Sequence, residues 1–335
     1  MQRTTKDRVR ELLERSPGAF ISGAHIAEEL GVSRNSVWKA VKALRNDGFE
    51  IESVTKRGHR LIPSPSTFDA ASIARLIDDP QIIIDFHDCV SSTNTVAKQL
   101  AEEGAPQGTL VVANSQSAGR GRQGRSFFSP QDTGVYFTLV LRPRFAVEDV
   151  ALITSFAACC LADAIDENTS KHAQIKWVND VFVDGRKVSG ILSEASFDAE
   201  TQTVAYVVVG IGVNVVEPPD GFEDDIVGAL TGDCTDANDL RCRIVANTVN
   251  RLMAGYEGVG ALPHLAAYRA RSILDGKRVE VYQGNEVFEA LVIGVDDDFS
   301  LRVRLDNGEE RALASGEVHI PSSQLAPAPR PCRRA

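Results

Sequence analysis

The sequence predicts an α+β protein of several domains: a winged helix-turn-helix unit, a central mixed α/β domain and a small C-terminal β-barrel. Its 335 residues are enough for two or three domains of ordinary size. The segment "IPSPSTFD" at 62–69 is rich in proline and hydroxyl residues and therefore predicts a linker. From Lys277 onward, short apolar runs separated by turn residues predict antiparallel strands. We therefore expect domain boundaries at 1–62, 63–69, 70–272 and 273–323, with a disordered tail at 324–335.

The charge of the chain changes sign across this linker. Residues 1–62 hold 12 Lys and Arg against 8 Asp and Glu, and the remaining 273 hold 24 against 38; the sums of +4 and −14 give the total of −10. A basic N-terminal segment followed by an acidic remainder predicts that only the N-terminal part contacts a polyanion.

Cysteine usage and hydropathy bear on the cellular compartment. The six cysteines are scattered and none forms a CxxC pair, so we expect reduced thiols. The N-terminus "MQRTTKDRVRELLERS" reads as a charged amphipathic helix and not as a signal peptide. No apolar run approaches the length of a membrane span. We expect a cytoplasmic protein with no membrane partner.

The N-terminal unit is predicted from helix start and stop signals. Apolar spacing predicts one helix over 5–15 and a second over 24–30, which Gly31 ends in a left-handed turn. Ser33 begins a third helix and Gly48 ends it. The segment "FEIESVTKRGHRL" then predicts a two-stranded hairpin with a basic tip. Two short helices joined by a glycine turn and followed by a basic hairpin are typical of a winged helix-turn-helix.

Such a unit can bind DNA through the third helix and the wing. The residues expected to contact DNA are Ser33, Arg34, Asn35, Ser36, Lys39, Lys42, Lys56 and Arg57. A helical protein-interaction domain is the alternative, and the outward cations favour DNA. The position of Trp38 is open, because it fits the core as well as the DNA-facing surface.

The segment "AGRGRQGRSFFSP" (118–130) nearly matches a phosphate loop but differs in architecture. A phosphate loop opens a long helix, whereas Pro130 interrupts this one, and Arg125 stands where the lysine belongs. We therefore predict a mobile basic loop that closes over an anionic ligand, with glycines for hinge motion and arginines as permanent donors. A solvated loop or an RNA-binding patch is the alternative.

Three further segments carry polar or glycine positions. Ser92, Thr93 and Asn94 follow a strand, where their side chains could equally cap the next helix. "IKWVNDVFVDGRKVSGILSEA" predicts a hairpin that brings Asp180 and Lys187 together, and a surface ion pair is the alternative.

"VVVGIGVNV" predicts a buried strand whose glycines stand where a bulky side chain would clash. A dinucleotide site is excluded because Val215 replaces the third glycine of its fingerprint.

In order and spacing, "SSTN", "QSAGRGRQGRSFFSP", "KWVND", "GRKVSGILSE" and "VGIGVNV" resemble the biotin–protein ligases. With the winged helix in front, the chain is similar to the bifunctional class, which joins biotin–[acetyl-CoA-carboxylase] ligase and biotin operon repressor. The resemblance covers about residues 5–320. It implies a class II synthetase-like central domain and an SH3-like C-terminal barrel. It also implies a two-step reaction, in which biotin and ATP give biotinyl-5′-AMP and the biotinyl group then passes to a carrier-protein lysine.

The resemblance also implies roles for individual residues. It implies catalytic roles for Arg120, Arg122, Asp180 and Lys187. The implied biotin-binding residues are Ser92, Thr93, Asn94, Gln116, Arg120, Gly121, Arg122, Lys187 and Gly190. The implied ATP- and adenylate-binding residues are Arg122, Phe127, Trp177, Asn179, Asp180, Lys187 and Asn214. We expect no metal site formed by protein side chains alone, and we expect Mg²⁺ to bind together with ATP.

The implied partners are the biotin carboxyl carrier protein, operator DNA and a second copy of the chain when adenylate is bound. The family has tryptophan and proline where this chain has Phe127 and Val178. Phe127 is still expected to stack on adenine, and Val178 frees a backbone N–H. The alternatives are a lipoate or octanoyl transferase on the same fold and a biotin-sensing transcription factor without catalysis.

Overall fold

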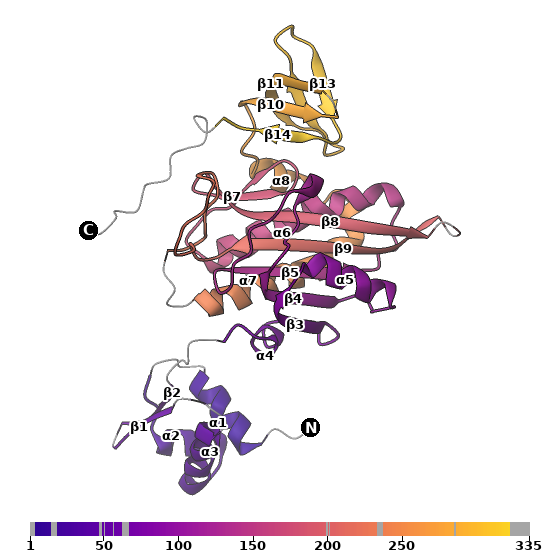
Figure 1. Ribbon diagram of the computed structural model, residues 1–335. Coiled ribbons are helices and arrows are strands. Elements are labelled where there is room, and N and C mark those ends of the chain that lie inside the picture. The colour runs from indigo at the N-terminus through magenta and orange to yellow at the C-terminus, as the bar shows by residue number, and fades with distance from the viewer. Residues whose placement is uncertain are drawn as a thin grey trace, which may run out of the picture. The chain divides into compact units, whose positions relative to one another are not determined.

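The computed structural model describes two compact units, 1–67 and 68–335, and each is considered by itself (Figure 1). The described residues are 4–14, 19–46, 49, 51–55, 57–61, 67–198, 200, 202–232, 237–284 and 286–321. Among them, no helix is both long and apolar enough to cross a membrane. Gly48, Lys56, most of the linker and the C-terminal tail lie outside the described residues.

The first unit is a three-helix bundle followed by a hairpin, as the sequence predicts. Its elements are α1 (Thr5–Glu14), α2 (Gly23–Leu30), α3 (Arg34–Asn46), β1 (Ile51–Val54) and β2 (Gly58–Leu61). Gly31 ends α2 in the left-handed conformation, with φ of 64°. The Ser33 hydroxyl accepts the Ser36 amide at 3.0 Å, which caps α3. Val37, Val41 and Leu44 are buried against α1 and α2, so the opposite face of α3 lies outward.

The second unit is built on a seven-stranded mixed sheet in the order β3-β4-β5-β9-β8-β7-β6. Its strands are β3 (Ile83–Val90), β4 (Thr109–Gln116), β5 (Gly134–Leu141), β6 (Gln174–Lys176), β7 (Asp180–Val183), β8 (Arg186–Asp198) and β9 (Thr203–Asn214). Only the β3–β4 pair is parallel, because α5 (Thr93–Glu102) crosses over between these two strands. The remaining pairs are antiparallel.

Helices cover both faces of this sheet, as Figure 1 shows. On one face, Ala97 and Ala101 of α5 pack on Val111, Val140 and Val208. The other face carries the larger core with α6 (Leu152–Asn168) and α7 (Ala237–Gly255). The helical elements that complete the unit are α4 (Ala70–Ala74), α8 (Leu265–Ala270) and short 3₁₀ turns at Arg122–Gly124, Val147–Ala151 and Tyr256–Ala261.

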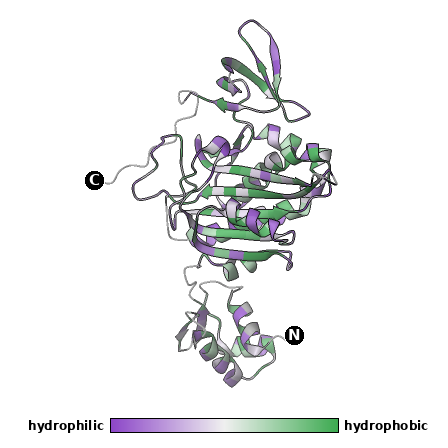
Figure 2. Ribbon diagram, turned by 45° about the vertical axis from the view of Figure 1, so that its right-hand side comes forward, coloured by the Kyte–Doolittle hydropathy of each residue, from purple (hydrophilic) through white to green (hydrophobic). Residues whose placement is uncertain are grey.

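The central strands β5 and β9 lie between helices on both faces and are accordingly mostly apolar and buried (Figure 2).

The C-terminal strands form a five-stranded antiparallel sheet in the order β13-β12-β11-β10-β14. They are β10 (Arg278–Gln283), β11 (Glu286–Val295), β12 (Leu301–Arg304), β13 (Glu310–Leu313) and β14 (Glu317–His319). Asn307-Gly308 forms the β12–β13 turn, with a φ of 86° at the glycine. This small barrel belongs to the same compact unit as the central sheet. One link is the Trp177 indole N–H, which donates to the Phe299 carbonyl at 2.9 Å.

Cys89, Cys159, Cys160 and Cys242 are free thiols, in line with the prediction from their spacing. The other two cysteines, Cys234 and Cys332, lie outside the described residues.

Candidate functional site

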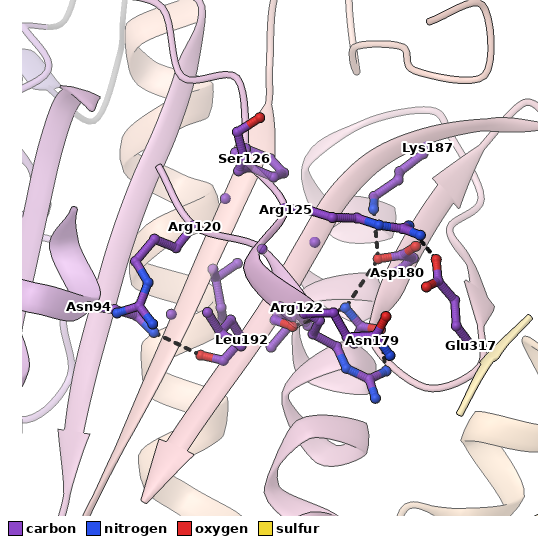
Figure 3. A pocket seen from close by; sticks show the side chains of 18 of the residues that line it. Asn94, Arg120, Arg122, Arg125, Ser126, Asn179, Asp180, Lys187, Leu192 and Glu317 are labelled. Atoms are coloured by element: carbon purple, nitrogen blue, oxygen red, sulfur yellow. Dashed lines mark hydrogen bonds and ion pairs between the residues drawn. The ribbon is translucent and has the colours of Figure 1, made fainter. Parts of the chain in front are cut away.

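A pocket lies on the α5 face of the central sheet, at the N-terminal end of that helix (Figure 3). Its lining comes from segments far apart in the chain: 92–94 with Gln116, 120–127, 176–180, 187–192, 210–212 and 316–318. The predicted biotin- and ATP-binding residues all line it except Asn214. The sheet and the barrel edge therefore bring together in space motifs that are far apart along the chain.

Glycines form the floor of the pocket, where the side chains of Asn94 and Phe127 lie too close to the sheet for a Cβ atom. A Cβ atom on Gly210 would lie 1.7 Å from the Asn94 Oδ1 atom, and one on Gly212 would lie 2.5 Å from the Phe127 ring. Gly190, on the neighbouring strand, pairs with Gly212 and also faces Phe127. The prediction that a bulky side chain would clash on this strand is confirmed.

The end of the pocket beside α5 is lined with hydrogen-bonding groups. Gln116 Oε1 accepts the Thr93 amide at 2.9 Å. Asn94 is buried; its amide donates to the Leu192 carbonyl at 3.1 Å, and its oxygen accepts from the Thr138 hydroxyl at 2.8 Å. Ser92 occupies the N-cap position of α5 but makes no capping hydrogen bond with its side chain. The capping alternative therefore fails for Ser92, whose hydroxyl borders the pocket instead.

The glycine- and arginine-rich loop folds back over the pocket without opening a long helix. It contains only the three-residue 3₁₀ turn, and the backbone bridges from Arg120 to Ser126. Arg122 points inward, where its guanidinium donates to Asn179 Oδ1 at 3.1 Å (Figure 3). The rejection of a phosphate-loop architecture is thus correct, and the loop still delivers cationic donors to the pocket.

Arg120 is held at the rim by a carboxylate that the sequence analysis missed. Its guanidinium lies 3.3 Å from Glu194 Oε1, and Lys98 Nζ lies 3.2 Å from the same oxygen. Asn94 donates to the second carboxylate oxygen at 3.0 Å. Burial alone would raise the pKa of the Glu194 carboxyl, but these donors and cations outweigh it, and the pKa is lowered. Glu194 is therefore a charged anchor for the loop.

The predicted Asp180–Lys187 pair forms across the β7–β8 hairpin, with Nζ 2.9 Å from Oδ1. Asp184 and Gly185 make its turn, both with positive φ. Lys176 lies beside the pair, a position to which the sequence analysis gave no role. Burial lowers the pKa of the Lys176 ammonium, the positive charge of Lys187 adds to this, and Asp180 opposes it. Two lysines therefore face one carboxylate at this end of the pocket.

The barrel closes one side of the pocket, which no local sequence pattern indicated. Glu317 at the start of β14 forms an ion pair with Arg125 of the loop (Figure 3). Arg122 also reaches the Gly316 carbonyl, at 3.5 Å. The C-terminal domain is thus part of the site and not an appendage to it.

Two predicted nucleotide-binding residues are used differently. The Asn214 side chain is buried and donates to the Gly228 carbonyl at 3.1 Å, away from the pocket lining. Trp177 does border the pocket, but its indole N–H is directed to the barrel. The following peptide bond, Trp177–Val178, is cis.

In the N-terminal unit, the predicted DNA-binding side chains on α3 are outward, with Ser36 partly covered. Ser33, Arg34, Asn35, Lys39 and Lys42 are exposed. On the wing, the Arg57 guanidinium lies 4.2 Å from the Phe20 ring centroid. Lys56 lies outside the described residues. Arg34, Lys39 and Lys42 of α3 are thus exposed cations, and together we call them the basic face of this unit. Exposed cations of this kind are what a nucleic acid would require.

Comparison with known proteins identifies the family. Residues 86–214 match the Biotin/lipoate A/B protein ligase family, residues 6–60 an HTH domain and residues 276–320 the Biotin protein ligase C terminal domain. The bifunctional ligase/repressor BirA of Bacillus subtilis is 32% identical over 328 residues, covering 96% of this chain and 100% of that protein. The chain belongs to the biotin–protein ligase family. Its match with this relative includes the helix-turn-helix, so it is of the bifunctional ligase/repressor type.

Other members of the family fit this assignment. BirA of Escherichia coli is 25% identical, covering 92% of this chain and 95% of that protein. A biotin protein ligase from Aquifex aeolicus, solved with biotin and ATP, has the same fold, with a TM-score of 0.57 at 24% identity; it covers 71% of this ligase and 98% of that chain. The match over all three domains favours a ligase/repressor over the lipoate or octanoyl transferase that the sequence left open.

Proposed function

We propose that this ligase activates biotin with ATP, transfers it to a lysine of the biotin carboxyl carrier protein of acetyl-CoA carboxylase, and represses genes of biotin synthesis. The observation that carries the proposal is the convergence of Arg122 with the Asp180–Lys187 pair over a glycine floor. Two anions must meet for the first step, and this pocket concentrates cationic donors where they would meet.

In the first step, a carboxylate oxygen of biotin attacks the α-phosphorus of ATP. A new phosphorus–oxygen bond forms, the bond to the β-phosphate oxygen breaks, and pyrophosphate leaves. Arg122 and Lys187 would neutralise the charge that develops on the α-phosphoryl oxygens. Arg120, at the rim, would hold the biotin carboxylate in line for attack.

The polar end of the pocket suits the ureido ring of biotin. Thr93, Gln116 and Ser92 offer hydroxyl and amide groups there. Asn94 already uses its amide and its oxygen within the protein, so it would act as a fixed wall and not as a ligand. The apolar thiophane ring would lie along Gly190, Ile191 and Leu192 of β8.

Phe127, on the pocket side of the loop, would supply the flat apolar surface for adenine, and Asn179 would orient the adenylate. The described residues contain no group of three or more His, Cys, Asp or Glu side chains able to hold a metal. A Mg²⁺ ion that arrives with ATP needs only one or two protein carboxylates. Asp180 would supply one once the nucleotide is bound, and the ion would offset phosphate charge.

In the second step, the amine of the carrier lysine attacks the acyl carbon of biotinyl-5′-AMP. An amide bond forms, the acyl–phosphate oxygen bond breaks, AMP leaves and the amine loses a proton. A mixed anhydride hydrolyses in water, so a loop closed over it and tied to the barrel through Arg125 and Glu317 would preserve it.

Repression would use the basic face of the first unit. One winged helix covers only a half-site, so operator binding would require a homodimer. Adenylate binding would order the loop and favour that dimer, which would couple low demand for ligation to repression. The protein would act in the cytoplasm.

Incubation with biotin, MgATP and a carrier domain tests the ligase activity by the mass of the acceptor. The acceptor should gain one biotin less one water, and the Lys187→Ala variant should be slower by at least about a hundredfold, the scale of one lost transition-state donor. Lipoate in place of biotin is the control. Biotin binding without any acceptor modification, or modification with lipoate only, would disprove the proposal.

A further inference from the structure

Trp38 is a large apolar side chain that the core of the first unit does not use. Its neighbours Val37, Ala40 and Val41 are buried, whereas Trp38 is 56% exposed. The other tryptophan, Trp177, is only 5% exposed. Within the described part of residues 1–67, Trp38 is the one large apolar side chain that is exposed.

The surroundings of this indole are cationic. The Lys42 ammonium lies 5.4 Å from its ring centroid, within range of a cation–π contact. Arg34 and Lys39 are also exposed, and α3, "RNSVWKAVKALRN", contains no acidic residue. Arg45 is instead turned toward the wing, where it donates to the Ile51 carbonyl at 2.9 Å.

The place of Trp38 along α3 suits contact with base edges. It is the fifth residue of the helix, about 6 Å along the axis from Arg34. The N-terminal turns of a recognition helix face the base edges when the helix lies in the major groove. The neighbouring lysines, Lys39 and Lys42, would then reach phosphates beside those bases.

An apolar side chain needs an apolar partner, and the major groove offers one. The C5-methyl group of thymine is the apolar feature of the base edges there, and aliphatic or aromatic side chains recognise it. An acidic protein surface would satisfy the lysines but not the indole. We propose that Trp38 is a specificity-determining residue that packs against thymine methyl groups in the operator, beside phosphate contacts of Lys39 and Lys42. This inference rests on the proposed repressor function.

The test begins with the full-length chain, biotin and MgATP, and a pool of random-sequence DNA duplexes, from which a preferred site is selected. Each thymine of that site is then replaced by uracil, which removes only the methyl group. We expect one or two replacements to weaken wild-type binding by about threefold or more. Trp38→Ala should weaken binding to the intact site by about tenfold, the scale of one lost base contact. The affinity of this variant should not fall further when those same thymines are replaced by uracil.

The Lys39→Ala variant is the matched contrast. It should weaken binding to all duplexes alike and reduce the salt dependence by about one counterion, without changing the effect of uracil. A melting curve of the first unit reports the fold of the Trp38→Ala variant, and its ligation activity reports that the second unit is unaffected.

The possible outcomes distinguish failure of the Trp38 inference from failure of the proposed repressor function. Selection of a site whose binding is insensitive to both uracil and Trp38→Ala overturns the role of Trp38 and leaves the repressor intact. Equal weakening of every duplex by Trp38→Ala also overturns it, because Trp38 would then be a phosphate anchor. Failure of the wild-type chain to select any sequence overturns the repressor function itself, and this inference with it.

Discussion

Glu194 has the most consequential contacts of any residue outside the predicted set. It accepts from Asn94 and pairs with both Lys98 and Arg120, so one carboxylate joins a buried wall of the pocket, helix α5 and the arginine-rich loop. With Glu194 in place, the Arg120 guanidinium has a fixed direction, which a binding site for a carboxylate requires.

Replacement of Glu194 by Gln should therefore act on biotin more than on ATP. The neutral amide cannot hold two cations, so Arg120 loses its orientation, and we expect the KM for biotin to rise about tenfold, as expected for a lost charge-assisted hydrogen bond. Steady-state kinetics with biotin and ATP varied separately measure this. Glu102→Gln, whose partner is the Tyr206 hydroxyl, is the matched control. An unchanged biotin KM would refute the positioning role.

At the scale of elements, α6, α8 and the barrel meet at His264, just before α8. The imidazole lies 2.9 Å from the Ser155 hydroxyl of α6 and stacks on Phe299 at 4.7 Å between ring centroids. Burial lowers the pKa of His264 to about 4 from 6.5. Phe299 also accepts the Trp177 indole N–H, so this junction connects the barrel to the pocket wall.

The lowered pKa of His264 predicts a loss of stability in mild acid. Between pH 6.5 and about 4, the unfolded chain binds a proton at this residue and the folded chain does not, so folding weakens as the pH falls. The cost for this one group should reach about 2–3 kcal/mol near pH 4.5. Urea unfolding of wild type and His264→Gln at pH 7.5 and pH 4.5 measures it. The variant should lose less stability than wild type over that interval, and equal losses would contradict the assignment.

At the scale of the whole molecule, the two compact units have separate hydrophobic cores. Val9, Leu13 and Ile26 belong to the first core and share no buried cluster with the second unit. The pocket lining lies wholly within 68–335. The proposed ligation site and the proposed DNA-binding surface therefore belong to different units.

Removal of residues 1–62 should accordingly leave ligation within about twofold of the full chain, because no pocket residue is lost. Operator binding should disappear, because the basic face is lost with the first unit. Mass measurement of the acceptor tests whether ligation is retained, and a gel-shift with the selected site tests whether operator binding is lost. Intact DNA binding by the shortened chain would exclude the winged helix as the DNA-binding element.

The sequence by itself determined the features that depend on residues close in the chain. Ser33 and Gly31 define helix ends, and the Asp184-Gly185 turn brings Asp180 to Lys187, because each effect acts within a few residues. Motif spacing also indicated the family and the residues of the pocket.

Only the tertiary structure decided which distant groups meet. The Arg120–Glu194 contact spans 74 residues and the Trp177–Phe299 hydrogen bond 122. The Asn214 side-chain amide donates to the Gly228 carbonyl. Strand alternation places this side chain on the same face of the sheet as Gly210 and Gly212, so the sequence alone would assign it to the pocket. Such contacts depend on how the sheet, loop and barrel pack, and packing is a property of the assembled core that no local pattern carries.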